Sequence, residues 1–169
     1  MVVYGHKCSL TEEERMTTKF RLYGCAALTL ALLIPIGALA HVSITPREST
    51  AGATEKYVVR VPTEGTVATT SAELEVPDGV TIETLAIPAG WKYQVKRKDD
   101  RIVAITWQMD IKPGEFAEFA FVARNPRDKT ELVWSLRQRF ADGTVTDWTT
   151  GPTGTRPTAV TKLAPIARP

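Results

Sequence analysis

The chain has 169 residues, of which 43% are hydrophobic and 24% are charged, and its formal net charge is +2. Because basic and acidic residues are interspersed along the chain, this charge does not indicate a nucleic-acid-binding protein. Both cysteines, Cys8 and Cys25, lie near the amino terminus. A domain formed by the rest of the chain therefore has no disulfide and depends on an ordinary hydrophobic core.

The segment 16–40 has the three-part pattern of a secretory signal peptide. Lys19 and Arg21 are followed by an apolar run, 25–36, and then by the small-residue motif Ala38-Leu39-Ala40. The run is shorter than the roughly 20 apolar residues that a membrane-spanning helix needs. We therefore predict cleavage after Ala40 and an exported protein, periplasmic or extracellular, with no membrane span after cleavage. The alternative is an uncleaved amino-terminal anchor.

Residues 1–15 do not fit this pattern, because Glu12, Glu13 and Glu14 are unusual in the basic start of a signal peptide. Met16 begins a better match, so we interpret 1–15 as an over-called start. Cleavage after Ala40 leaves 129 of the 169 residues, enough for one domain with its own core. These residues hold 17 of the 21 Lys and Arg and 16 of the 19 Asp and Glu, which gives a net charge of +1.

Short stretches of alternating or β-branched residues recur about every ten residues along this part of the chain. The clearest are 57–61, 72–76, 80–85, 102–107, 116–122 and 132–136. Turn residues separate them, and no stretch has a sustained helical repeat. We predict an all-β fold for 41–150, a single antiparallel β-sandwich of about seven to nine strands with an immunoglobulin-like or fibronectin-III-like outline. The Pro-, Gly- and Thr-rich residues 151–169 are predicted to form a tail.

His41 becomes the first residue if the signal peptide is cleaved, and no other histidine follows it. A peptide α-amine has a pKa of about 8, so a metal ion can displace its proton near neutral pH. The α-amine and the imidazole Nδ1 of His41 can then hold one metal ion in a six-membered chelate. Two nitrogen donors in one plane, completed by oxygen ligands or water, suit tetragonal copper(II). Zinc and nickel are the competing ions, whereas calcium and magnesium prefer oxygen ligands.

A carboxylate partner for His41 can be sought from strand pairing. We expect the first strand at about 41–45 and the second at about 55–61. If the two pair as an antiparallel hairpin, the start of the first lies beside the end of the second, which brings Glu64 within reach of His41. Glu48 is seven positions further along, more than about 20 Å away if that segment is extended. This geometry favours Glu64 and leaves Glu48 as the alternative.

A series of segments runs in one order from 41 to about 157 without large gaps. It includes His41-Val42-Ser43-Ile44-Thr45-Pro46-Arg47-Glu48, Val61-Pro62-Thr63-Glu64, Pro88-Ala89-Gly90-Trp91-Lys92, Pro113-Gly114-Glu115-Phe116, Phe121-Val122-Ala123-Arg124-Asn125-Pro126 and Asp147-Trp148-Thr149. This series resembles the YcnI-like family of bacterial copper-binding domains. In that family the processed amino-terminal histidine binds copper(II) through a mono-histidine brace, with a carboxylate and a tryptophan in the same site. The resemblance implies His41 as the bidentate ligand, Glu64 as the carboxylate and Trp148 as an aromatic wall over the metal.

The four tryptophans fall into two groups. Trp91, Trp107 and Trp134 lie in apolar strand patterns or directly after a turn, so we expect them in the core. Trp148 lies at the end of a strand, just before the polar tail, which favours a place in the site over core packing.

Three classes of function follow. The one we favour is an exported copper(II)-binding protein, a chaperone or homeostasis protein that exchanges copper with a copper-accepting protein of the envelope. It is not expected to be an enzyme. Oxidative enzymes with a histidine brace add a second histidine, which the residues after His41 lack, and a Ser or Cys triad has no histidine either. The remaining alternative is an adhesion or interaction sandwich of the cell envelope that binds no metal.

Overall fold

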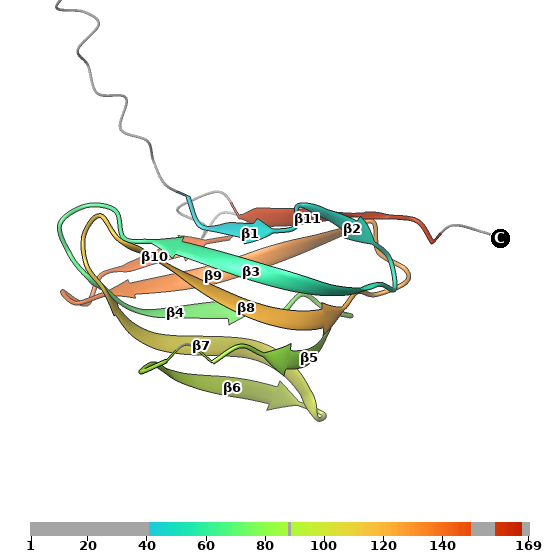
Figure 1. The fold of residues 1–169 in the computed structure, drawn as a ribbon, viewed down its shortest axis with the longest axis horizontal. Helices are drawn as coiled ribbons and strands as arrows, with labels where there is room; N and C mark the ends of the chain where they lie inside the picture. The colour runs from blue at the N-terminus through green and yellow to red at the C-terminus, as the bar shows by residue number, and fades with distance from the viewer. Residues whose placement is uncertain (1–40, 88, 150–157, 167–169) are drawn as a thin grey trace, which may run out of the picture. The chain divides into compact units, whose positions relative to one another are not determined.

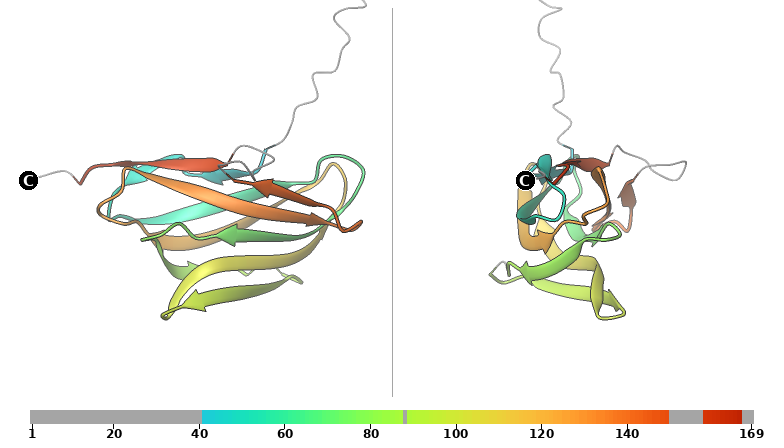
Figure 2. Two further views of the ribbon diagram at one scale, coloured as in Figure 1. Left: turned by 180° about the vertical axis from the view of Figure 1, so that it is seen from behind. Right: turned by 90° about the vertical axis from the view of Figure 1, so that its right-hand side faces the viewer.

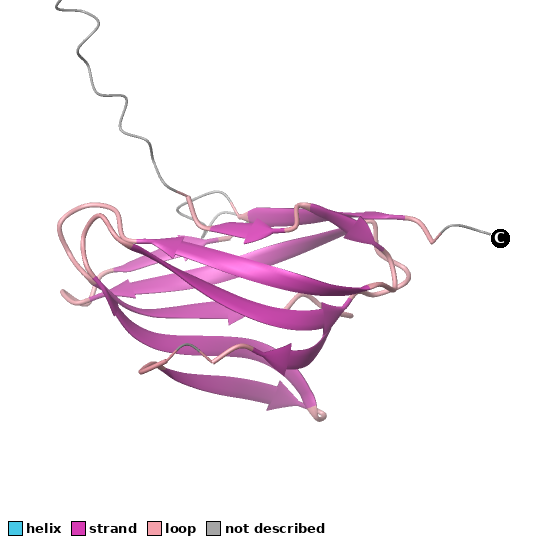
Figure 3. Ribbon diagram, in the orientation of Figure 1, coloured by secondary structure: helices cyan, strands magenta, loops and turns pink. Residues whose placement is uncertain are grey.

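The computed structural model describes residues 41–87, 89–149 and 158–166. These residues lie in one compact unit, 39–169, which holds the whole of the core given below. Strands joined by turns make up all the described ranges, with no helix among them (Figure 3). Accordingly, those ranges contain no helix long and apolar enough to cross a membrane.

The described residues contain eleven strands, which form two sheets. The two sheets face each other, as Figure 1 and the side view in Figure 2 show. The strands are β1 (Ser43–Thr45), β2 (Glu48–Thr50), β3 (Thr54–Pro62), β4 (Thr69–Glu75), β5 (Thr81–Leu85), β6 (Lys92–Lys98), β7 (Arg101–Ile111), β8 (Phe116–Arg124), β9 (Glu131–Phe140), β10 (Val145–Trp148) and β11 (Ala159–Ala164). One sheet has the order β1-β3-β8-β5. The other has the order β2-β11-β9-β4-β7-β6, with β10 also paired with β9. The predicted all-β sandwich is confirmed, with more strands than the seven to nine expected.

The carboxyl-terminal strand corrects the prediction of a tail from residue 151. β11 pairs with β9 on one side and with β2 on the other, and it buries Thr161 and Leu163. Residues 159–164 are thus part of the sandwich. The rest of the predicted tail, apart from 158, 165 and 166, lies outside the described residues, as does the predicted signal peptide.

The core comes from the inward-facing residues of both sheets. Tyr57, Val59 and Val61 of β3 face Leu132, Trp134 and Leu136 of β9, and all six are buried. Tyr57 and Trp134 pack with their ring centroids 5.0 Å apart. Each such side chain contributes roughly 1.5–3 kcal/mol through burial of its apolar surface. Trp107 and Trp134 are in the core as predicted, and Trp91 packs against it.

The amino-terminal segment contributes to both sheets. β1 pairs with β3, whereas β2, which follows the cis bond between Thr45 and Pro46, pairs with β11 in the other sheet. The expected antiparallel pairing of the first strand with 55–61 is therefore correct, although the connection is longer than a simple hairpin. Its register sets Ser43 opposite Arg60. β1 also lies beside β11, so the two sheets approach each other along this edge.

Candidate metal centre

His41 and Trp148 meet at the edge where the two sheets approach. His41 is exposed and lies two residues before the start of β1, while Trp148 ends β10 of the other sheet. Their ring centroids are 5.8 Å apart with an interplanar angle of 67°, an edge-on arrangement. Two of the three residues predicted for the metal site are thus in contact, although more than a hundred residues separate them in the sequence.

Glu64 follows the end of β3. The β1–β3 register sets Ser43 opposite Arg60. If this register is extended by two residues, His41 comes opposite Pro62. Glu64 follows Pro62 by two residues. Its side chain is half-buried, with the Oε1 atom inside the protein. Glu64 and His41 therefore lie at the same end of the β1–β3 pair.

Glu48, the alternative carboxylate, lies in the other sheet. It is exposed at the start of β2, where it pairs with Lys162 of β11. Together with Glu131 it lines an open depression over β2 and β11. This position favours Glu64 over Glu48 as the carboxylate beside His41.

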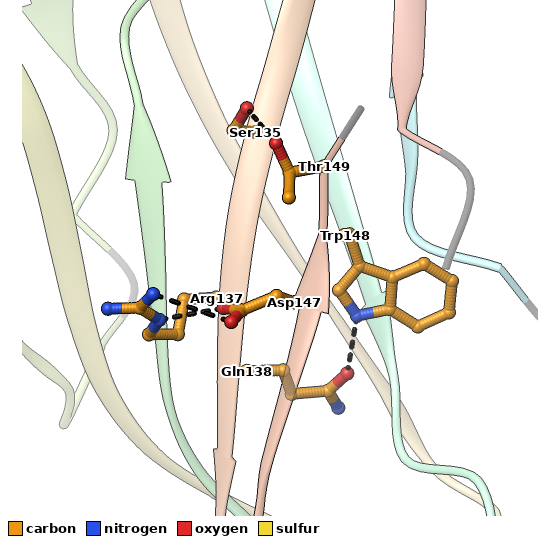
Figure 4. Close-up of polar contacts among 6 residues, drawn as sticks. All are labelled: Ser135, Arg137, Gln138, Asp147, Trp148 and Thr149. Atoms are coloured by element: carbon orange, nitrogen blue, oxygen red, sulfur yellow. Dashed lines mark hydrogen bonds and ion pairs between the residues drawn. The ribbon is translucent and has the colours of Figure 1, made fainter. Parts of the chain in front are cut away.

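Trp148 is a core residue as well as a neighbour of His41. Only 3% of its surface is exposed and it packs in the core cluster, so the expectation that Trp148 would not be a core residue is wrong. Its indole Nε1 donates a hydrogen bond to Gln138 Oε1 at 3.1 Å (Figure 4). Because that nitrogen is engaged by Gln138, Trp148 offers the edge and face of its ring rather than a donor atom.

Gln138 is a site residue that sequence reasoning missed. It lies in β9, is 1% exposed, and donates from Nε2 to the carbonyl oxygen of Pro62 at 2.8 Å and to Thr69 Oγ1 at 2.7 Å. The signal in the sequence was its spacing, because it continues the inward row of Leu132, Trp134 and Leu136 at intervals of two. A polar residue on such an apolar face needs hydrogen-bond partners in the interior.

Two buried threonines extend this network toward Glu64. The hydroxyls of Thr63 and Thr69 are 2.7 Å apart, and Thr63 Oγ1 lies 3.2 Å from the carbonyl oxygen of Ile111. Since that carbonyl can only accept, one arrangement of protons satisfies the whole chain, with Thr69 donating to Thr63 and Thr63 donating to Ile111. The backbone of Thr63 is also held, because its N–H donates to Glu115 at 2.9 Å and its carbonyl accepts from Gly114 at 3.1 Å. The residue before Glu64 is therefore fixed through both its backbone and its side chain.

The outer face of β9 differs from this interior. Arg137 Nε donates to Asp147 Oδ1 at 2.7 Å, and the hydroxyls of Ser135 and Thr149 are 3.0 Å apart (Figure 4). The hydrogen bond with Asp147 and the negative charge of that residue raise the pKa of Arg137. The two side chains are 50% and 28% exposed, and a partly exposed ion pair of this kind stabilises the fold by at most about 1 kcal/mol. Arg137 is thus exposed on this outer face.

The donor set near His41 limits what a metal could use. Within 41–87, 89–149 and 158–166, no group of three or more His, Cys, Asp or Glu side chains could hold a metal ion together. A metal at this edge would have one imidazole and one nearby carboxylate from side chains. It would need further ligands from a main-chain amine or from water. That set fits a small tetragonal ion and does not resemble a closed site of four side chains.

Similarity to known proteins identifies the family of this chain. The family described as "Domain of unknown function (DUF1775)" matches residues 41–166. The chain belongs to this family, whose members are YcnI-like. The YcnI-like resemblance seen in the sequence is therefore confirmed. The family match begins at His41 and extends through β11.

Two relatives of this YcnI-like protein are informative. The copper-binding protein CutI of Bacillus subtilis (strain 168) is 35% identical over 152 residues, which cover 88% of this chain and 74% of CutI. A solved structure from Nocardia farcinica, of an uncharacterized protein with an immunoglobulin-like fold, shares 27% identity with a TM-score of 0.63. That match covers 73% of this chain and 98% of the Nocardia protein. The immunoglobulin-like outline predicted for the sandwich is confirmed.

Proposed function

We propose that this protein binds copper(II) outside the cytoplasm through His41, after removal of residues 1–40, and carries copper without turning over a substrate. The α-amine and the imidazole Nδ1 of His41 would form a mono-histidine brace. Glu64 would supply a carboxylate oxygen, and Trp148 an apolar wall beside the metal. The observation that carries the proposal is the contact of His41 with Trp148, 5.8 Å between ring centroids.

Three further findings support the proposal. The relative CutI is named a copper-binding protein. The family match starts at His41, the residue that cleavage after Ala40 would expose. Glu64 follows the strand paired with β1, so a carboxylate lies at the same end of the sandwich as the histidine.

The chemistry of the donors suits copper(II). Copper(II) is at the top of the affinity order of divalent metals and favours nitrogen donors in a plane. Both nitrogens of the brace bind the metal only after losing competing protons, so copper affinity falls as the pH is lowered. An apolar wall limits the access of water to one side of the ion. The exposure of His41 leaves the opposite side open to a copper-accepting protein, so release needs no lid to move.

The brace is tested by changing what precedes His41. Copper(II) is titrated by electron paramagnetic resonance into one protein that begins at His41 and another with one additional residue before it. We expect a one-to-one tetragonal signal with nitrogen couplings from the first protein, whereas the second, which lacks the histidine α-amine, does not give it. Equal binding by both proteins contradicts the brace, and no binding by either leaves an exported sandwich without a metal.

The carboxylate is tested by a matched pair of variants of the protein that begins at His41. Glu64→Gln is expected to lower copper(II) affinity by about tenfold, equivalent to ~1.4 kcal/mol. Glu48→Gln serves as the control and should bind like the wild type, because Glu48 is exposed on β2 in the other sheet. Competition with a chelator of known affinity measures both. A loss of affinity in Glu48→Gln alone would reverse the assignment.

A further inference from the structure

Gln138 connects Trp148 with the segment that leads to Glu64, the two parts of the proposed site other than His41. Its amide oxygen accepts from the Trp148 indole, and its amide nitrogen donates to the carbonyl of Pro62, two residues before Glu64. These bonds are 3.1 Å and 2.8 Å long, and the side chain is 1% exposed. A single buried side chain therefore holds the aromatic wall and the segment that leads to the carboxylate.

The chemistry of its partners determines the orientation of this amide. An indole N–H can only donate, so the oxygen of Gln138 must face Trp148. A backbone carbonyl can only accept, so the nitrogen must face Pro62. The second N–H is used by Thr69, at 2.7 Å. Gln138 thus has one arrangement in which each partner is satisfied, and it cannot turn without breaking three hydrogen bonds.

The geometry points to Gln138 as a positioning residue for copper, an inference that rests on the proposed function. Through Trp148 it holds the ring against which the His41 imidazole lies, and through Pro62 it holds the strand end from which Glu64 extends. It does not touch the metal. Its role is to fix the wall and the carboxylate relative to each other, so that the brace, the carboxylate oxygen and the apolar side of the site keep one geometry. Groups that orient metal ligands in this way change metal affinity by roughly 10–100-fold when they are removed.

The chain offers a matched control in Asn125. This residue is also a buried amide, 3% exposed, with an oxygen that accepts from Tyr57 Oη at 2.7 Å. Its nitrogen donates to Ser49 Oγ at 3.1 Å and to the carbonyl of Thr50 at 3.0 Å. Asn125 lies at the other end of β3, because it follows Arg124, which pairs with Thr54. Its loss should weaken the fold without reaching the proposed site.

The test compares Gln138→Met with Asn125→Leu, two near-isosteric replacements, in the protein that begins at His41. The first readout uses the metal-free protein. His41 is its one histidine, so the imidazole C–H resonances in a proton NMR spectrum are unambiguous. In Gln138→Met we expect these resonances to move toward the positions of an unstructured peptide, because the Trp148 ring is no longer held beside them. In Asn125→Leu they should stay at the wild-type positions.

The second readout uses copper(II). Gln138→Met should still bind one copper through the two nitrogens of His41, with altered copper hyperfine coupling and release to a chelator that is about tenfold faster. Asn125→Leu should keep the wild-type spectrum and release rate even where its midpoint of thermal unfolding falls. If Gln138→Met does not fold, Thr69→Val replaces it, since that change removes one acceptor of Gln138 and leaves the Trp148 bond. A smaller change in the same direction is then expected.

The outcomes separate this inference from the proposed function. In one outcome the wild type binds copper(II) with the expected signal, but Gln138→Met matches Asn125→Leu in both readouts. Gln138 is then a structural residue only and the inference is wrong. The same conclusion applies to Thr69→Val where it replaces Gln138→Met. If the wild type gives no nitrogen-coupled copper signal, the proposed function fails and the inference fails with it. Unchanged imidazole resonances in Gln138→Met contradict the inference without any reference to copper.

Discussion

Two buried amides hold the two ends of β3, and each accepts a hydrogen bond from an aromatic side chain. Gln138 accepts from the Trp148 indole, and Asn125 accepts from the Tyr57 hydroxyl. Leaving a buried polar group without a partner costs about 1–3 kcal/mol, so each amide stabilises the fold only while its partners are in place. The two aromatic partners differ in surroundings. Tyr57 has no exposed surface, whereas the Trp148 ring reaches the exposed His41.

The surroundings of Tyr57 predict a loss of stability at alkaline pH. Burial raises the pKa of its phenol above the ordinary value of about 10. Above that ordinary value the unfolded chain loses the phenol proton while the folded chain keeps it, so the free energy of unfolding falls as the pH rises toward the folded-state pKa. The slope from this group is up to about 1.4 kcal/mol per pH unit, and it vanishes well below pH 10.

Urea unfolding between pH 9 and pH 11 measures this effect. Tyr57→Phe should be less stable than the wild type at pH 9, because the bond to Asn125 is lost, and the difference should shrink as the pH rises. Tyr93→Phe is the control, since Tyr93 is exposed on β6 and its replacement should leave the pH dependence unchanged. Parallel curves for the wild type and Tyr57→Phe would show that the buried phenol does not control stability in this range.

At the scale of elements, β11 is an interior strand although it is the last strand of the described residues. It lies between β2 and β9 in the seven-stranded sheet. Thr161 Oγ1 accepts from Trp134 Nε1 at 3.1 Å and donates to the carbonyl of Pro46 at 3.0 Å. Without β11, the buried indole of Trp134, the part-buried carbonyl of Pro46 and one edge of β2 would lose their partners. The strand therefore connects the amino-terminal segment to the rest of the sheet.

Truncation tests this role of β11. A chain that ends at residue 158 is expected to lose cooperative unfolding. The loss of the buried Leu163, at roughly 1.5–3 kcal/mol, adds to about 1–3 kcal/mol for each buried group left without a partner. Together these approach the ~5–15 kcal/mol that a domain of this kind has in total. A chain that ends at Ile166, where the family match ends, is the control and should unfold like the full chain. Circular dichroism during heating distinguishes the two, and an unchanged midpoint for the shorter chain would contradict the prediction.

The strands that could be predicted from the sequence are those with one apolar face. β3 and β9 alternate between buried and exposed positions, and this alternation is visible in the sequence. β6 was missed because it is an edge strand with mostly exposed side chains, so it has no apolar period to detect. β11 was missed because its Pro- and Thr-rich surroundings indicate a tail. β11 is buried because it pairs with β2 and β9, two strands that are distant from it in the sequence.

The candidate site, like the fold, could be predicted only in part from the sequence. Position in the chain singled out His41, and the pairing of β1 with β3 related it to the region of Glu64. Gln138 could not be found in that way. The spacing of β9 shows that its side chain points inward, but Pro62 and Trp148 become its neighbours only when β3 and β10 are brought to the same end of β9.

At the scale of the whole molecule, the proposed site lies where the two sheets meet. His41 precedes β1, an edge strand of one sheet, and Trp148 ends β10, which pairs with β9 in the other. Glu64 follows β3. Ligands from separate strands come together only in the folded protein. A metal that uses all of them therefore binds the folded state more tightly than the unfolded state, and it stabilises the folded state. The proposed brace would be an exception within this set, because both of its nitrogens would belong to one residue and would remain together when the chain unfolds.

Copper should therefore raise the midpoint of thermal unfolding by less than its affinity suggests. A ligand that binds only the folded state at 100 times its Kd adds about 2.7 kcal/mol, but binding of copper by His41 in the unfolded chain reduces that gain. What remains is the contribution of the fold, through Glu64 and the Trp148 wall. We expect a rise with the protein that begins at His41, a smaller rise with Glu64→Gln, and a decrease in both as the pH is lowered and protons compete for the nitrogens. Scanning calorimetry with and without copper(II) measures these shifts. Equal shifts in the wild type and Glu64→Gln would mean that Glu64 adds nothing to binding at His41 in the folded state.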